Sequence, residues 1–427
     1  MLDLTKWINL DSAINVQIGY AEGMAESLTA NQATALLGVS RATLYAYVSR
    51  GLVRSEPGTG RTRDRLYAAE DVLTLVRRKD ERRDPEKKVQ AALQWGSPLM
   101  ESELTLIRDG QLFYRGQNAL ELASHASLEN IAGLLWTGKL QAVNVPLKAQ
   151  LSHLPMLAET SLLESFGHAL TSAGAHDLQA SDARLEALPG NAARILALLF
   201  AVVERSLKLP AAPDLALHER LGRAWANGRP AETDLLRRAL VLIADHELNI
   251  SSFTARCVAS SGASLHHVAL AGLCALQGPN HGLAVEQAAY LLELTEERGP
   301  HRAVAEFTRR TGRLSGFGHH LYPEGDPRAR ELLEHMFTSF PKESAVQAAR
   351  ALSHEVEREL GNRPNVDLAL ATVGRLLGGP AEQGVALFVL GRTVGWLAHG
   401  IEAVRQRQTI RPRAKYVGPM PSDAPKT

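Results

Sequence analysis

The chain has 427 residues, of which 45% are hydrophobic and 22% are charged, ordinary values for a globular protein. These values exclude a disordered chain, a collagen-like fibre and a small disulfide scaffold, and at about 150 residues per domain the length predicts two or three domains. Because 47 Lys and Arg nearly balance 46 Asp and Glu, any affinity for nucleic acid must come from a local basic patch.

Two cysteines, Cys257 and Cys274, stand in apolar surroundings without the spacing of a metal site or a CxxC motif. They predict buried thiols, a reducing compartment and a cytoplasmic location, and no motif predicts a metal. The N-terminus lacks the basic and then apolar pattern of a signal peptide. No apolar run approaches 18 residues, so we expect no membrane span.

Residues 28–79 predict a compact module that begins with two short helices. Thr29 caps the first helix, over residues 29–37, and Ser40 caps the second, Arg41–Arg50, with a turn at Gly38 between them. This spacing is that of a helix-turn-helix. The apolar residues placed to pack the two helices together are Ala33, Leu37, Val39, Leu44 and Val48.

A basic, glycine-containing segment, Pro57–Arg63, follows, and a further helix is predicted around Asp71. This order resembles the winged helix-turn-helix of MerR-type regulators. Residues 29–95 hold 13 Lys and Arg against 8 Asp and Glu, a local excess of +5 that favours phosphate contacts, although a helix-turn-helix also serves as a plain docking corner. DNA is therefore a candidate partner. The residues predicted to contact it are Arg41, Thr43, Tyr45, Arg50, Arg61 and Arg63.

The remainder of the chain predicts a linker and a helical body. Residues 1–27 form a weakly patterned N-terminal extension, and the charged stretch within residues 80–100 is typical of a linker or hinge helix. From residue 101 the chain is rich in Leu and Ala at helical spacing. One strand pair is predicted, Leu104–Ile107 with Gln111–Tyr114, joined by a hairpin turn at Asp109-Gly110.

Four polar segments interrupt the apolar helices of this body, and each alone has a plain explanation such as a helix cap or a turn. A zinc site of the HExxH type is excluded at His246, because residue 250 is isoleucine. No complete dinucleotide loop, P-loop or GxSxG elbow is present. The four segments are Asp245–Asn249, Gly278–Gly282, Gly316–Arg328 and Pro364–Asp367.

Taken together, these segments resemble the citrate synthase family, in the family's order and at suitable separations. The resemblance covers residues 104–418 and extends to the Leu134–Gly138, Arg392–His399 and Arg411–Gly418 segments. It implies an all-α fold in which a small helical domain closes over substrate bound to a large one. The implied large domain comprises residues 101–284 and 381–427, and the small domain comprises residues 285–380.

The family condenses acetyl-CoA with oxaloacetate, a tricarboxylic acid cycle reaction that needs no further cofactor. The resemblance implies that Asp367 removes a methyl proton, that His281 stabilises the resulting enol and that His319 polarises the ketone of oxaloacetate. The residues implied to hold oxaloacetate are His246, Arg328, Arg392 and Arg411. In the family, the last of these arginines reaches the neighbouring subunit, so the resemblance implies a homodimer. The residues expected to line the CoA site are Leu314, Ser315, Gly316, Phe317 and Gly318.

Two further functions stay open at this point. One is a 2-methylcitrate synthase that uses propionyl-CoA, since one methylene changes binding by only about 1–3 kcal/mol. The other is a transcriptional regulator whose body senses a metabolite. Asn280 and His320 depart from the usual residues of the family and are candidates for tuning the acyl preference.

Overall fold

The computed structural model describes residues 27–57, 65–83, 100–146, 160–212 and 214–419. The chain divides into two compact units, Met1–Glu101 and Ser102–Thr427, and each unit is considered by itself. Most of the predicted N-terminal extension, and residues 84–99 of the predicted linker, lie outside the described residues.

The first unit contains the predicted helix-turn-helix. Helix α2 (Ala30–Leu37) is capped by Thr29, which forms a capping box with Gln32, and it ends at Gly38, whose φ is 57°. Helix α3 (Arg41–Ser49) begins at the Ser40 cap, as predicted. Its buried residue Leu44 packs with Ala33 and Leu37 of α2, so the apolar spacing of the sequence becomes the core of this unit.

A small antiparallel sheet and a third helix complete this unit. The strand order is β1-β3-β2, with β1 at Ser27–Thr29, β2 at Ser55–Pro57 and β3 at Arg65–Ala68. Helix α4 (Ala69–Arg83) follows at once and extends into the predicted linker. The β2 and β3 strands are the two sides of a wing, and the basic segment between them, including Arg61 and Arg63, lies outside the described residues.

The second unit begins with a three-stranded sheet, β4 (Thr105–Arg108), β5 (Gln111–Tyr114) and β6 (Gln117–Asn118). The predicted hairpin is present: Arg108 pairs with Gln111, and both turn residues, Asp109 and Gly110, have positive φ. The helices of this unit are α6 (Ala119–His125), α7 (Leu128–Thr137), α8 (Leu162–His176), α9 (Leu188–Ser206), α10 (Leu217–Trp225), α11 (Pro230–Leu242), α12 (Ile250–Ser260), α13 (Leu265–Leu276), α14 (Ala284–Arg298), α15 (Pro300–Thr311), α16 (Pro327–Ser339), α17 (Ser344–Leu360), α18 (Val366–Leu376) and α19 (Glu382–Gln406).

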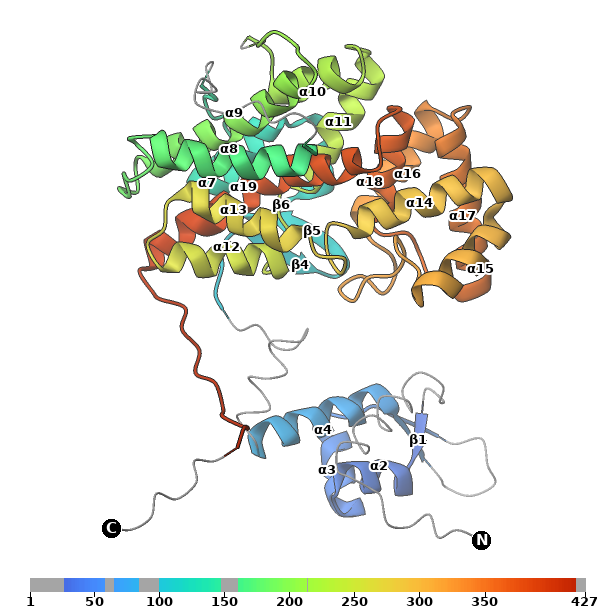
Figure 1. Ribbon diagram of the computed structural model, residues 1–427. Helices are drawn as coiled ribbons and strands as arrows, with labels where there is room; N and C mark the ends of the chain where they lie inside the picture. The colour runs from blue at the N-terminus through green and yellow to red at the C-terminus, as the bar shows by residue number, and fades with distance from the viewer. Residues whose placement is uncertain (1–26, 58–64, 84–99, 147–159, 213, 420–427) are drawn as a thin grey trace. The chain divides into compact units, whose positions relative to one another are not determined.

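Helix α19 is the central element of this unit (Figure 1). It packs against α7, α9, α11, α12, α13 and α18. It is long and apolar enough to cross a membrane by composition, but its apolar window is fully buried within the protein. A helix that is apolar on every side is expected at the centre of a large core.

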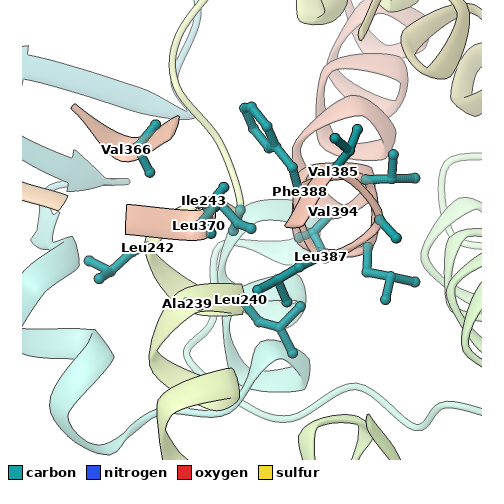
Figure 2. Close-up of a cluster of buried hydrophobic side chains, with 14 of the residues drawn as sticks. Ala239, Leu240, Leu242, Ile243, Val366, Leu370, Val385, Leu387, Phe388 and Val394 are labelled. Atoms are coloured by element: carbon teal, nitrogen blue, oxygen red, sulfur yellow. The ribbon is translucent and has the colours of Figure 1, made fainter. Parts of the chain in front are cut away.

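A cluster of apolar side chains joins α11, α18 and α19 (Figure 2). Leu240 and Ile243 come from the end of α11, Leu370 from α18, and Val385 and Phe388 from α19. Because protein cores are close-packed, this cluster fixes where the polar loop after α11 and the first turn of α18 can lie.

Helices α14 to α18 gather on one side of the unit (Figure 1). Helix α14 packs on α15, α17 and α18, and α16 packs on α17 and α18. This group meets the remaining helices through α6, α11 and α19. The division into a large domain and a small domain that closes over substrate stays a prediction.

One expectation about the cysteines is wrong. Cys257 is half-buried, but Cys274 is exposed. On α13 the inward positions are taken by Gly272, Leu273 and Leu276, which leaves Cys274 on the solvent side of the helix. An apolar stretch of sequence therefore does not bury all of its members.

Gly395 in α19 tests the close packing of this core. Its amide donates to the Ala244 carbonyl (2.9 Å), and a Cβ there would collide with that carbonyl and with the Asp245 carboxylate. We predict that Gly395→Ala lowers the free energy of unfolding by about 1–3 kcal/mol through overpacking. Thermal denaturation measures this effect.

Gly190 in α9 provides the matched control, because a Cβ there meets nothing within 4 Å. Gly190→Ala should raise stability by about 0.5–1 kcal/mol, since alanine is the better helix former. Equal Tm values for the two variants would contradict the close approach of α19 to residues 244–245.

Candidate active site

All four polar segments lie at the ends of core elements in the second unit. His246 follows α11, His281 precedes α14, His319 precedes α16, and Asp367 is in the first turn of α18. The charges of Arg328 and Arg392 act on both His246 and Asp367, so the structure gathers side chains from distant parts of the sequence.

Three aromatic rings form the centre of this cluster. The rings of His246 and His319 meet edge-on, with centroids 5.2 Å apart, and the His319 and Tyr322 centroids are 4.9 Å apart. His246 Nε2 lies 3.0 Å from the Tyr322 hydroxyl. Burial lowers the pKa of His319 to about 4 and that of His246 well below its ordinary value, and nearby arginines add to both shifts. Both imidazoles are therefore neutral at pH 7.

The hydrogen bond at His319 defines its tautomer. Its Nδ1 accepts from the Leu321 amide (3.1 Å), so the neutral ring carries its proton on Nε2. A neutral imidazole that donates from Nε2 is suited to polarising a carbonyl oxygen without transferring a full charge to it.

Arg328 and Asp326 form a fully buried ion pair. Two nitrogens of the Arg328 guanidinium donate to the two Asp326 oxygens, at 2.9 and 2.7 Å. Asp326 also accepts from the backbone amides of Arg328 (3.0 Å) and Val366 (3.0 Å). One carboxylate thus caps α16 and holds the start of α18.

Arg392 is equally buried, but it lacks such a partner: among the described residues, no carboxylate forms an ion pair with it. Its Nε donates to the Ile243 carbonyl (2.8 Å), and its guanidinium lies 4.8 Å from the centroid of the Phe388 ring. Burial lowers its pKa to about 10. A buried guanidinium of this kind is suited to holding the carboxylate of a ligand.

Asp367 has an environment that makes it a base near neutral pH. Burial raises the pKa of its carboxyl to about 7, with a further contribution from Asp326, while Arg328 and Arg392 oppose the rise. Its own amide is held by the Asn365 cap (3.0 Å). A carboxyl that titrates near 7 is matched to general acid–base catalysis.

His281 is oriented by a hydroxyl group on α12. Its Nε2 lies 2.8 Å from Ser251 Oγ, which accepts from the Trp396 indole (3.0 Å). The edge of the His281 ring also meets Phe388, at a centroid distance of 5.8 Å. Burial lowers the pKa of His281 to about 3, so this ring is neutral as well.

The predicted CoA segment, Leu314–Gly318, lies against the start of α18. The Gly316 carbonyl accepts from the Asn365 amide (2.9 Å), and the Gly318 amide donates to the Arg363 carbonyl (2.8 Å). Gly316 has a φ of 88° and lies against Leu368, so the close approach requires glycine. Ser315 and Phe317 are buried, and Leu314 packs on the core.

Arg411 is not brought to this cluster. It is exposed, on the irregular segment after α19. The amide of the preceding residue, Ile410, donates to the Ser260 hydroxyl at the end of α12 (3.1 Å). The start of α12 carries Ser251, and eleven helical residues span about 16 Å. Within one chain, Arg411 is therefore remote from the other predicted ligands.

Several residues of the site were not predicted. The sequence pattern around Asp326 indicates only a turn or a helix cap, and no pattern singles out Ser251, Tyr322 or Phe388. The Asp-Pro pair before Arg328 is a recognisable cap signal, with proline at the first helical position. No sequence signal pairs Ser251 with His281, because only the packing of α12 beside the turn before α14 does so.

The helix-turn-helix unit presents a separate polar surface. Arg41, Tyr45 and Ser49 recur every fourth residue on α3 and are exposed, whereas Leu44 is buried. Arg41 donates to Asn31 (2.6 Å), and Thr43 is held by the Ser40 cap. Arg50 is exposed at the end of α3.

Two family models match the sequence. "Citrate synthase, C-terminal domain" matches residues 91–413, about three quarters of the chain, and "MerR HTH family regulatory protein" matches residues 28–79. The two matches fall on the two units of the structure.

Curated relatives and solved structures agree with these matches. Citrate synthase 2 of Bacillus subtilis is 31% identical over 74% of this chain and 93% of its own length. A 2-methylcitrate synthase of Mycobacterium tuberculosis is 27% identical over 72% of this chain and 84% of its own length.

Among solved structures, the citrate synthase of Thermotoga maritima has a TM-score of 0.66 and 29% identity, covering 77% of this chain and 96% of its own. The Thermoplasma acidophilum citrate synthase has the same TM-score and coverage with 27% identity, and its structure is a ternary complex with carboxymethyl coenzyme A and oxaloacetate.

The raised pKa of Asp367 leads to a prediction about stability. Between about pH 4 and pH 7 the folded carboxyl keeps a proton that the unfolded chain releases, so this group lowers the free energy of unfolding as pH rises. Asp367→Asn removes this loss. The free energy of unfolding of the variant, relative to that of the wild type, should therefore rise between pH 5 and pH 8 by on the order of 2–4 kcal/mol. Denaturation at each pH measures this difference.

Asp326→Asn is the control of opposite sign. Arg328 holds the pKa of Asp326 below its ordinary value, so this carboxylate stabilises the fold above pH 4 and loses that contribution as pH falls. Replacing the Asp326 carboxylate should therefore lower the free energy of unfolding most at neutral pH. Parallel pH profiles for Asp367→Asn and the wild type would contradict a perturbed Asp367.

Proposed function

Because the chain belongs to the citrate synthase family, we propose that its body condenses acetyl-CoA with oxaloacetate to give citrate and free CoA. The observation that carries this proposal is the meeting of a carboxyl with a pKa near 7, two buried arginines and three neutral histidines. The related structure that holds a CoA analogue together with oxaloacetate supports the same pair of substrates.

In this proposal the arginines bind the diacid. Arg392 has buried guanidinium nitrogens without an ion-pair partner among the described carboxylates, so it takes one carboxylate of oxaloacetate. Arg328 shares its charge between Asp326 and the second carboxylate, with His246 beside it. His319 donates from Nε2 to the ketone oxygen.

The acyl donor is activated from the other side. Asp367 removes a proton from the methyl carbon next to the thioester carbonyl, and the enol oxygen is stabilised by His281. For His281 to donate from Nδ1, its Nε2 must accept, so Ser251 donates to that nitrogen. The indole of Trp396 can only donate to Ser251. The single Ser251 proton is therefore available either to His281 or to the Asn249 side-chain oxygen, 2.8 Å away, and in this proposal it turns to His281.

Condensation and hydrolysis then follow. The methyl carbon bonds to the ketone carbon, and the ketone oxygen gains a proton at His319. Water then cleaves the thioester and releases CoA as a thiol. No redox partner is needed, because every electron pair stays within the two substrates and the water.

We propose further that the active enzyme is a homodimer in which Arg411 serves the partner's site. The remoteness of Arg411 from the other ligands within one chain supports this arrangement. The body would then be an acyltransferase that converts the acyl group to an alkyl group on transfer, acting in the cytoplasm.

The first test is release of free thiol from acetyl-CoA in the presence of oxaloacetate. We predict turnover by the wild type and a fall of about 10²–10⁴-fold for Asp367→Asn, the range for loss of a general base. Propionyl-CoA is assayed in parallel, and a higher kcat/KM with it would assign the body to 2-methylcitrate synthesis, as in the Mycobacterium tuberculosis relative. No thiol from either donor would sink the enzymatic proposal and favour a body that only senses a metabolite.

A second function, DNA binding, is proposed for the first unit because it matches the MerR family and exposes Arg41, Tyr45 and Arg50 around α3. We predict that affinity for a random-sequence DNA duplex falls steeply with salt, and that Arg50→Met lowers the slope of log K against log salt by about one. Arg108→Met, an exposed arginine of the second unit, should leave the slope unchanged. Binding that ignores salt would instead favour a docking module.

A further inference from the structure

Asn280, the residue before His281, is committed to a contact that the sequence did not predict. Its Oδ1 accepts from Arg313 Nη1 (2.5 Å), and Arg313 Nη2 donates to the neighbouring Pro279 carbonyl (2.5 Å). One guanidinium therefore holds both a side chain and a backbone carbonyl of the turn that carries His281.

The same guanidinium also joins this turn to α14. Arg313 Nη2 lies 3.3 Å from Gln287 Oε1, and the hydroxyl of Ser315 donates to that same oxygen (2.5 Å). We call Asn280, Gln287, Arg313 and Ser315 the clasp. It links two segments, the turn at 278–283 and the loop at 312–318, that the α14–α15 hairpin separates in sequence.

The loop at 312–318 is in turn fixed to the helix that carries the base. Gly316 and Gly318 bond to Asn365 and Arg363, directly before α18, and His319 follows the loop. This loop therefore contributes to the spacing among His281, His319 and Asp367. The clasp supplies the direct side-chain bonds between the loop and the His281 turn.

We propose that Arg313 is a positioning residue, which sets the placement of His281 relative to Asp367 and the acyl donor through its bonds to Asn280 and Pro279. The contacts of the clasp are present in the structure whatever the protein does. Their effect on catalysis rests on the function proposed above. Asn280 then acts through Arg313 and does not select the length of the acyl chain.

The alternative is that these exposed polar contacts affect neither stability nor catalysis. Arg313 and Asn280 are both exposed, and exposed pairs add only about 0–1 kcal/mol to stability. For catalysis a small stabilisation still matters, because a misplacement of about 1 Å costs on the order of 10²-fold in rate.

The test compares Arg313→Met, Arg313→Lys and Asn280→Leu with Arg309→Met, an exposed arginine four residues earlier that makes none of the clasp contacts. We expect kcat for thiol release to fall about 10–100-fold in Arg313→Met and in Asn280→Leu. The double variant should be no slower than the worse single variant, because both remove the same clasp. Arg313→Lys should recover part of the rate, and Arg309→Met should match the wild type.

Two further readouts separate positioning from other roles. The KM for oxaloacetate should stay within about 2-fold, since Arg328, Arg392 and His246 lie outside the clasp. The ratio of kcat/KM for acetyl-CoA and propionyl-CoA should also stay within about 2-fold. A large change in that ratio, or additive losses in the double variant, would overturn the proposal.

Amide hydrogen exchange tests the clasp without any turnover. Peptides covering 278–287 and 312–318 should exchange faster together in both Arg313→Met and Asn280→Leu, and not in Arg309→Met. Unchanged exchange would refute the clasp even if the wild type is inactive. Faster exchange with an unchanged kcat would reduce it to a structural contact, whereas an inactive wild type would count against the proposed function alone.

Discussion

The geometry of the candidate site depends on the Asp326 carboxylate. It accepts from two guanidinium nitrogens of Arg328 and from the amides of Arg328 and Val366, all within 3.0 Å. A buried ion pair of this kind is tolerated only where further hydrogen bonds satisfy the carboxylate. Through these four bonds one side chain fixes the first turns of α16 and α18, and with them the charge of Arg328 and the position of Asp367.

The charged side chains around Asp326 differ in whether they have a partner of opposite charge. Arg328 has Asp326, whereas Arg392 contacts the Ile243 carbonyl and the face of Phe388 and forms no ion pair with a carboxylate in the part of the chain that the structure describes. Asp367 is half-buried and has no ion-pair partner among the described residues, and burial raises its pKa to about 7. A site with an unmatched guanidinium and an unmatched carboxyl is less stable than a filled core would be, but it is prepared for a diacid and for proton removal.

The neutral histidines follow from the same burial. The arginines and the low polarity around His246, His281 and His319 disfavour an additional positive charge, so their pKa values fall. Each ring has a hydrogen-bond partner that helps to orient it: Tyr322 for His246, Ser251 for His281 and the Leu321 amide for His319. Electrostatics thus sets the protonation state of the rings, and packing sets their direction.

The local elements and the residue types of the site follow from the amino-acid sequence. Thr29, Ser40 and Gly38 defined the helix-turn-helix because capping and left-handed turns are read over a few residues, and Asp109-Gly110 defined the hairpin for the same reason. The resemblance also named the chemically active side chains. Which side chains meet depends on the packing of the helices. Asp326 with Val366, Ser251 with His281 and Asn280 with Arg313 are pairs separated by 30 to 40 residues. Such contacts depend on how α12, α14, α16 and α18 pack, and helix packing is set by the whole core and not by any short stretch of sequence.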